Sequence, residues 1–185
     1  MPQPPKTDPE TILQTALQTV ERDGPQALTV RALARDLGLS QNALYWHYPS
    51  RTALLEAVIR RGLEELLDQL KNATPQAKAL SDLLPVAETY LQFAQERPKL
   101  YALMTSPVED SGMSRPLWTY TTDLLAPFVG ADRAPEAAVA LWSYLHGAAS
   151  LRPLLPLKEG KPESGLHLGL QALIRGLGAL SESQS

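Results

Sequence analysis

Two short amphipathic stretches, separated by a glycine turn, are the feature that most constrains how this chain can fold. Apolar residues recur at helical spacing in the first stretch, which Thr29 can cap at its start. Gly38 then supplies a left-handed turn. Ser40 caps a second helix that covers only Gln41–His47, because Tyr48-Pro49 breaks it. Two short helices joined in this way predict a helix-turn-helix.

The rest of the chain also has helical periodicity, and no run of strict alternation indicates a strand. Asp8 or Thr7 and Pro9 open a first helix that ends near Gly24, and Ser50 caps a long fourth helix. Proline and glycine separate the further helices that we expect over 74 or 81–97, 98–105, 114–128, 132–151 and 164–180. We therefore predict an all-α protein of about nine helices. We expect two domains, an N-terminal three-helix unit at 1–51 and a C-terminal unit at 52–185, connected by the long fourth helix.

Composition narrows the function classes. The 185 residues contain no cysteine, which excludes a disulfide framework and a thiolate nucleophile and fits the reducing cytoplasm. The N-terminus is polar, and no stretch approaches the ~18 apolar residues of a membrane span, so we expect neither export nor membrane insertion. The three histidines fall on separate helices, and no phosphate-binding loop, zinc spacing or nucleophile elbow is present. We expect neither an enzyme nor a bound cofactor or metal.

The short helix after Ser40 carries side chains suited to reading DNA. If Leu44 turns inward, the residues left outside are Gln41, Asn42, Tyr45, Trp46 and His47. Glutamine and asparagine can pair with adenine in the major groove, and an aromatic ring can contact a thymine methyl. The alternative is that the aromatic residues are merely core, but a helix of seven residues cannot bury them all together with Leu44.

Phosphate contacts are expected around this helix. The side chains of Thr29, Arg31, Tyr45, His47 and Arg51 have donors suited to phosphate oxygens, which fix the register of a protein on DNA. Ser40 is also expected to contact DNA. Helix N-termini such as those capped by Thr29 and Ser50 add backbone donors. Residues 1–51 carry equal numbers of basic and acidic side chains, and the whole chain has a net charge of -3. We therefore expect moderate affinity that weakens steeply with salt.

The segment LTVRALARDLGLSQNALYWHYPSRTALLEAV resembles the DNA-binding domain of the TetR (tetracycline-repressor-like) family of regulators. The resemblance covers roughly residues 10–59, including the Leu-Gly-Leu-Ser turn and the Ala-Leu-Tyr-Trp-His-Tyr run. Arg51 stands where the family usually has lysine. Further along, ERPKLYALM and ALWSYLHGAASL resemble a TetR subgroup that carries a Trp and a His-Gly. The resemblance implies a homodimer that binds double-stranded operator DNA.

Small residues predict a dimerisation surface on the last two helices. At 3.6 residues per turn, the small residues of the last helix fall within about 40 degrees of Gly165 around the helix axis. Glycine costs helix stability, so a stripe of it suggests that another backbone approaches closely. An intramolecular hairpin of the two helices is the alternative. The residues expected at the dimer interface are Ala137, Ala140, Gly147, Ala148, Leu151, Gly165, Gly169, Ala172 and Gly176.

An effector pocket is expected in the middle of the C-terminal domain. Trp142 and His146 lie four residues apart, on the side of their helix opposite the dimer residues, and we expect them to point into the chain's own core. Large apolar and aromatic side chains of neighbouring helices suit a mostly apolar pocket for a small apolar effector. The alternative is that all of these are ordinary core residues. The expected pocket residues are Tyr90, Phe93, Tyr101, Met104, Trp118, Tyr120, Trp142 and His146.

These features together predict a DNA-binding regulator, and the resemblance to the TetR family implies that it is a repressor. A symmetric dimer would place two recognition helices in successive major grooves, about 34 to 36 Å apart, on a palindromic operator. An effector that favours one conformer of the protein would move the long fourth helix and release the DNA. The alternative is a ligand-sensing or interaction module of the same fold without DNA binding.

Overall fold

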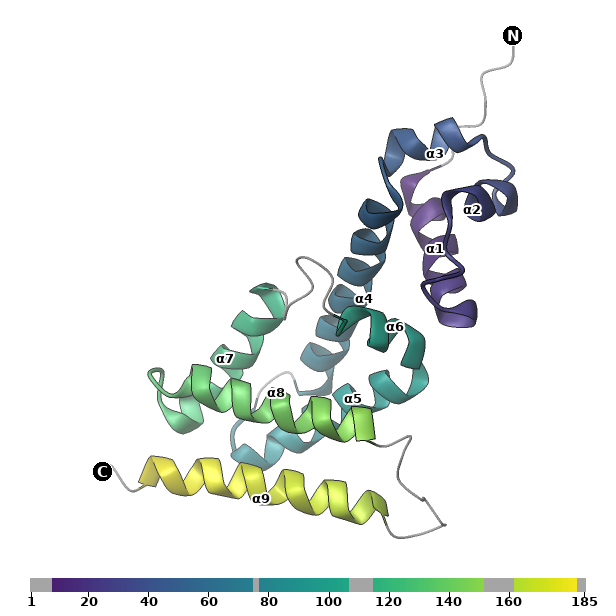
Figure 1. Cartoon of the computed structure of the whole chain (residues 1–185). Helices are drawn as coiled ribbons and strands as arrows, with labels where there is room; N and C mark the ends of the chain where they lie inside the picture. The colour runs from purple at the N-terminus through teal and green to yellow at the C-terminus, as the bar shows by residue number, and fades with distance from the viewer. Residues whose placement is uncertain (1–7, 75–76, 107–114, 152–161, 183–185) are drawn as a thin grey trace. The chain divides into compact units, whose positions relative to one another are not determined.

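The computed structural model describes residues 8–74, 77–106, 115–151 and 162–182, and every regular element among them is helical (Figure 1). The helical class expected from the sequence is confirmed. The elements are α1 (Pro9–Asp23), α2 (Val30–Asp36), α3 (Gln41–His47), α4 (Arg51–Ala73), the short 3-10 turn η1 (Leu80–Asp82), α5 (Leu83–Glu96), α6 (Pro98–Met104), α7 (Arg115–Val129), α8 (Ala134–Leu151) and α9 (Pro162–Glu182).

Helix starts and stops follow the local signals in the sequence. Asp8 caps α1 by accepting from the Glu10 amide, and Gly24 ends the same helix at a φ of 90°. Thr7, the alternative cap, lies outside the described residues. Pro85 stands at the start of a helix and does not kink it. It lies in the first turn of α5, where a backbone N–H would have no partner within the helix.

The chain separates into two compact units, and α4 passes from one to the other. The first contains residues 1–64 together with 97–112, and the second contains 65–96 together with 113–185. The first unit is thus larger than the domain expected at 1–51, because it includes the first part of α4 and all of α6. The functional boundary after residue 51 stays a prediction.

The core of the first unit forms where α1, α2, α3 and the start of α4 meet. Its fully buried side chains include Ile12, Leu17, Val20, Leu33 and Leu54, each at most 2% exposed. Burial of each such aliphatic side chain contributes roughly 1.5–3 kcal/mol. A short helix such as α3 could not persist alone and depends on this packing.

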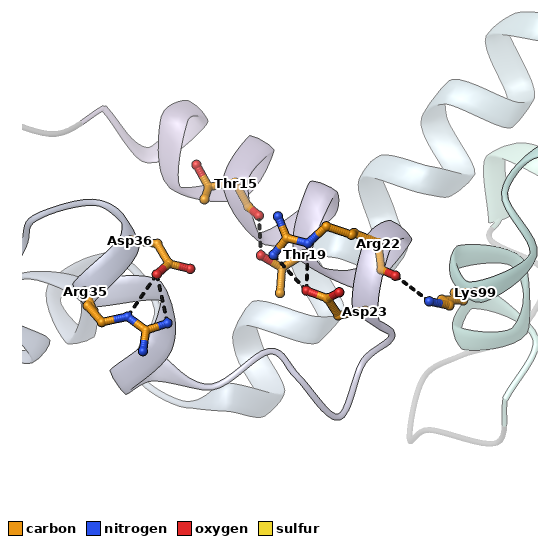
Figure 2. A network of polar contacts seen from close by, with 7 residues as sticks. All are labelled: Thr15, Thr19, Arg22, Asp23, Arg35, Asp36 and Lys99. Carbon is orange, nitrogen blue, oxygen red and sulfur yellow. Dashed lines mark hydrogen bonds and ion pairs between the residues drawn. The ribbon is translucent and has the colours of Figure 1, made fainter.

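Helix α6 completes this unit from a distant part of the sequence. It packs against α1, and Gly62 of α4 lets it approach closely. A Cβ at Gly62 would lie 2.8 Å from Met104 Sδ and 3.2 Å from a Leu100 methyl. The Lys99 ammonium also donates to the Arg22 carbonyl at the end of α1 (Figure 2). These contacts fix α6 as part of the N-terminal unit.

The second unit is built on α8, which packs against α7, α5 and α9. In Figure 1, α8 and α9 run alongside each other, in green and yellow. Leu141 and Leu145 of α8, with Leu170 and Ile174 of α9, are buried. The C-terminal helices therefore share a core, and each keeps one face exposed.

Candidate nucleic-acid interface

The turn between α2 and α3 is held by backbone geometry that only a few residues allow. Gly38 has a φ of 65°, in the left-handed region that favours glycine, and the Leu39 amide donates to the Ala34 carbonyl at 2.8 Å. The chain thus reverses sharply between the two helices. The predicted helix-turn-helix is confirmed.

Hydroxyl caps begin the helices on either side of this turn. Thr29 Oγ1 accepts from the Ala32 amide at 3.1 Å, and Ser40 Oγ accepts from the Ala43 amide at 3.2 Å. Both side chains are among those expected to contact DNA. Each cap uses an oxygen lone pair, so the hydroxyl proton stays available for donation to a phosphate.

One buried leucine orients the recognition helix α3. Leu44 is 3% exposed, and the opposite side of the helix carries Asn42 and Trp46, one turn apart. Trp46 is 88% exposed and Tyr45 is 46% exposed, and Gln41 and His47 are also exposed. The five side chains expected to read DNA therefore all project from the unit.

Arg31 is the cation of α2 that stays available for a phosphate. Its side chain is exposed and makes no ion pair or hydrogen bond within the described ranges of the chain. By contrast, Arg35 pairs with the neighbouring Asp36 at 3.1 Å, and Arg22 of α1 pairs with Asp23 at 2.7 Å (Figure 2). The Arg22 hydrogen bond lowers the pKa of Asp23 and keeps it ionised. Local acidic neighbours thus neutralise two of the basic side chains in this unit.

Arg51, expected to contact phosphate, has a bracing role in the structure. Its half-buried guanidinium donates from Nε to the Leu28 carbonyl at 2.7 Å and from Nη2 to the Pro25 carbonyl at 2.6 Å. These carbonyls lie in the loop that leads to the Thr29 cap. Arg51 therefore ties the start of α4 to the start of α2, and its contact with phosphate stays a prediction.

The C-terminal end of α3 is tied to α1. The Tyr48 hydroxyl donates to the Pro9 carbonyl at 3.4 Å, and partial burial raises its pKa. The Tyr48 side chain is half-buried. Nearby, both terminal nitrogens of Arg61 donate to the Glu10 carboxylate at 2.6 and 2.7 Å. This charge-assisted pair lowers the pKa of Glu10 and joins α4 to α1.

A small apolar cavity lies in the second unit. Its volume is about 40 Å³, and it is lined by Leu70, Val86, Tyr90, Leu117, Tyr120, Thr121, Leu124, Leu141, Trp142 and Leu145. Three of the expected pocket residues, Tyr90, Tyr120 and Trp142, therefore come together. The seven others were missed. Six of them had only the signal of an apolar residue at helical spacing, which is common to every core position, and the polar Thr121 had none.

The other expected pocket residues do not line this cavity. Tyr101 and Met104 are buried on α6, which belongs to the N-terminal unit. Phe93 is 1% exposed in the core, and Trp118 and His146 are half-buried outside the lining. Sequence spacing places residues on helix faces, but it does not say which helices meet, so a role for these five residues in an effector pocket stays a prediction.

The face of α8 is rotated from the one expected. Ala137 and Ala148 are each 4% exposed, because α8 packs this side against its own unit, so they are not free to meet a partner. Trp142 was expected to point into the core, yet it is 36% exposed. His146 stacks on it, with ring centroids 5.6 Å apart. The small side chains of Ala137 and Ala148 therefore serve close packing within the chain.

The remaining small residues expected at the dimer interface are mostly accessible. Gly169 is the exception, since a Cβ there would lie 2.5 Å from the Tyr144 hydroxyl of α8. Its lack of a side chain serves the packing of α9 on α8. The others are exposed or, for Gly147, half-buried: Ala140, Leu151, Gly165, Ala172 and Gly176.

Within the part of the chain that the structure describes, no group of three or more His, Cys, Asp or Glu side chains is arranged to hold a metal ion. Among the same residues, no helix combines the length and the apolar character needed to cross a membrane.

Comparison with known proteins covers both units. Residues 12–58 match the family described as "Bacterial regulatory proteins, tetR family", and residues 83–164 match "Tetracyclin repressor-like, C-terminal domain". An uncharacterised HTH-type transcriptional regulator of Mycobacterium tuberculosis is 32% identical over 155 residues, which span 78% of this chain and 69% of that protein.

Solved structures show the same fold. A protein of unknown function from Rhodococcus sp. RHA1 has a TM-score of 0.78 and 25% identity, covering 96% of this chain and 100% of that one. A single-substitution variant of TetR from Acinetobacter baumannii AYE, solved in complex with minocycline, has a TM-score of 0.70 and 24% identity. The matched region covers 95% of this chain and 98% of that TetR chain.

Proposed function

Because this chain belongs to the tetR family of bacterial regulatory proteins and is a DNA-binding transcriptional regulator, we propose that it is a repressor. It acts in the cytoplasm as a homodimer on a near-palindromic operator, and a small, mostly apolar effector releases it. The observation that carries this proposal is the outward face of α3, where Asn42 and Trp46 lie opposite the buried Leu44.

Base reading and phosphate binding fall to different residues. Gln41 and Asn42 can hydrogen-bond base edges, and Trp46 and Tyr45 can contact thymine methyls. Phosphates are held by Arg31 and by donors near it, which we take to be Thr29, Ser40 and His47. Two such units related by a twofold axis would read half-sites about one helical turn apart. A palindromic operator follows from this symmetry.

The exposed faces of α8 and α9 support the homodimer. Val139 and Leu151 of α8 are 50% and 53% exposed, and Leu168 of α9 is 67% exposed. They accompany exposed small residues, Ala172 and Gly176 among them, that would let a second pair of helices approach closely. Packing both helices across a twofold axis would cover these apolar side chains in a four-helix interface.

The cavity of the second unit supports an apolar effector. The first unit holds a larger groove of about 480 Å³. Its lining is charged, because it includes Glu56, Arg60, Arg61 and Glu64. The cavity beside Tyr120 has no charged lining. A ligand without charge therefore loses less hydration there than a charged one would.

Fluorescence anisotropy with DNA that flanks the protein's own gene tests operator binding. Asn42→Ala and Arg31→Ala should each weaken binding by roughly 5- to 150-fold, since removing a base or phosphate contact costs about 1–3 kcal/mol. Asn72→Ala and Arg115→Ala remove exposed side chains of the same types elsewhere and should change nothing. If no segment binds at low salt, the protein is a sensing or interaction module instead.

Sedimentation equilibrium tests the dimer. Ala172→Glu places a charge on the exposed face of α9 and should shift the protein toward monomer. Ala102→Glu introduces the same charge at an exposed position of α6 and serves as the control. Equal masses for both variants and the parent protein would contradict this interface.

A further inference from the structure

One hydrogen bond joins the wall of the apolar cavity to the end of α4. The Tyr120 hydroxyl donates to the Leu70 carbonyl at 3.0 Å, and both residues line the cavity. Leu70 is among the last four residues of α4, and the carbonyls of such residues have no amide partner within their helix. Tyr120 therefore supplies a partner that the helix cannot provide.

The chemistry of the lining sets which ligands fit. No lining residue carries a charge, so a ligand must be neutral to avoid an uncompensated desolvation penalty. Thr121 is already committed, because its hydroxyl donates to the Leu117 carbonyl within α7 at 2.8 Å. Tyr120, by contrast, donates to another helix. Burial raises the pKa of Tyr120, so its hydroxyl keeps its proton at neutral pH.

We propose that Tyr120 is a switch residue: a neutral ring compound with a hydrogen-bond acceptor accepts the hydrogen bond of the Tyr120 hydroxyl in place of the Leu70 carbonyl and frees the last turn of α4. This proposal rests on the effector site of the proposed function and names both its ligand class and the contact that responds. A ligand shifts an equilibrium only through a contact that differs between two states. The acceptor supplies that difference, since a hydrocarbon of the same shape leaves the Tyr120–Leu70 bond intact.

The cavity must widen to admit such a ligand, and the structure shows where. About 40 Å³ holds little more than one water molecule. The lining residues Leu70, Leu117 and Leu141 are at most 6% exposed and are fixed in the core. Trp142 is 36% exposed and Tyr120 is half-buried, so these two side chains can move outward with little loss of packing. Outward movement of Tyr120 would therefore both widen the cavity and release the Leu70 carbonyl.

Two probes of nearly equal shape test the switch in the full-length protein. Acetophenone has a carbonyl acceptor, whereas α-methylstyrene has a methylene group in its place. Calorimetry measures binding of each probe, and amide hydrogen exchange measures opening of the last turn of α4. The variants are Tyr120→Phe and, as the matched control, Tyr144→Phe, which removes another half-buried hydroxyl on α8 outside the cavity.

Acetophenone should speed exchange at the last turn of α4 by about 2- to 12-fold, the equivalent of one ordinary hydrogen bond. α-Methylstyrene should bind without this change. Tyr120→Phe should exchange at the faster rate without any probe and show no further response to acetophenone. Tyr144→Phe should respond as the parent protein does, and melting curves of both variants report whether they are folded.

Three results would overturn the switch: no binding of either probe, equal effects of the two probes on exchange, or an acetophenone response that persists in Tyr120→Phe. The exchange readout contains no DNA, so it separates this proposal from the proposed function. If exchange responds as expected but no operator binding is found, the repressor function fails and the switch stands.

Discussion

Replacing Arg51 by methionine should destabilise the N-terminal unit and weaken DNA binding, without changing how steeply binding depends on salt. Methionine keeps an unbranched apolar stem and loses the two guanidinium hydrogen bonds to the Pro25 and Leu28 carbonyls. A hydrogen bond from a charged donor contributes about 1.5–3 kcal/mol, which we discount to about 1 kcal/mol each because the group is only half-buried. The free energy of unfolding should fall by about 2 kcal/mol, and Tm by about 4–8 °C for a chain of this size.

Arg31→Met is the matched comparison, because Arg31 is exposed and has no partner in the described part of the chain. This substitution should change stability by less than about 0.5 kcal/mol. The slope of log affinity against log salt should become shallower by about 0.9 for each phosphate that the variant no longer neutralises. Urea denaturation followed by circular dichroism and anisotropy across salt measure the two effects. If Arg51→Met is as stable as the parent protein, or flattens the salt slope as Arg31→Met does, Arg51 is a phosphate contact rather than a brace.

Three further perturbations have definite expected results. Leu44→Ala removes the 3% exposed anchor of α3 and should cost about 2–5 kcal/mol in urea denaturation, with loss of operator binding. Gly169→Ala should lower Tm despite the better helix propensity of alanine, because its Cβ would meet the Tyr144 hydroxyl; adding Tyr144→Phe should restore part of the loss. Backbone amides of Lys78 and Ala79 lower the pKa of Asp82 from 3.8, so its stabilising effect is present at neutral pH and disappears as pH falls through the lowered pKa. Thermal melts at a series of pH values through this titration should show a smaller loss of stability for Asp82→Asn than for the parent protein. An equal loss in both proteins would contradict this role of the carboxylate.

Local rules predicted the N-terminal unit well. The caps at Thr29 and Ser40 and the left-handed Gly38 depend on a few neighbouring residues, and all three are confirmed. The orientation of α3 follows from Leu44, because a seven-residue helix with one large core side chain has only one face to bury. Here the physical causes lie within one or two turns of the chain.

Contacts between distant helices were beyond the reach of the sequence. A small residue such as Ala137 or Ala148 is expected both where a partner subunit packs and where another helix of the same chain packs. Their spacing therefore could not distinguish a dimer contact from a contact within the chain. Tyr101 and Met104 are aromatic and apolar like true pocket residues, yet α6 packs them into the other unit. The bracing role of Arg51 depends on where two loop carbonyls lie, which no motif encodes.

The place of α6 in the N-terminal unit has a consequence for the order of folding. Residues 1–64 cannot complete their packing until residues 97–104 have been synthesised, because Leu100 and Met104 cover Gly62, and Arg97 pairs with Glu21. Contacts over such long separations slow folding, since a large loop must close before they form. A nascent chain that has emerged only as far as α4 therefore exposes apolar surface on α1 and α4. Synthesis of the second unit must be under way before the first can be completed.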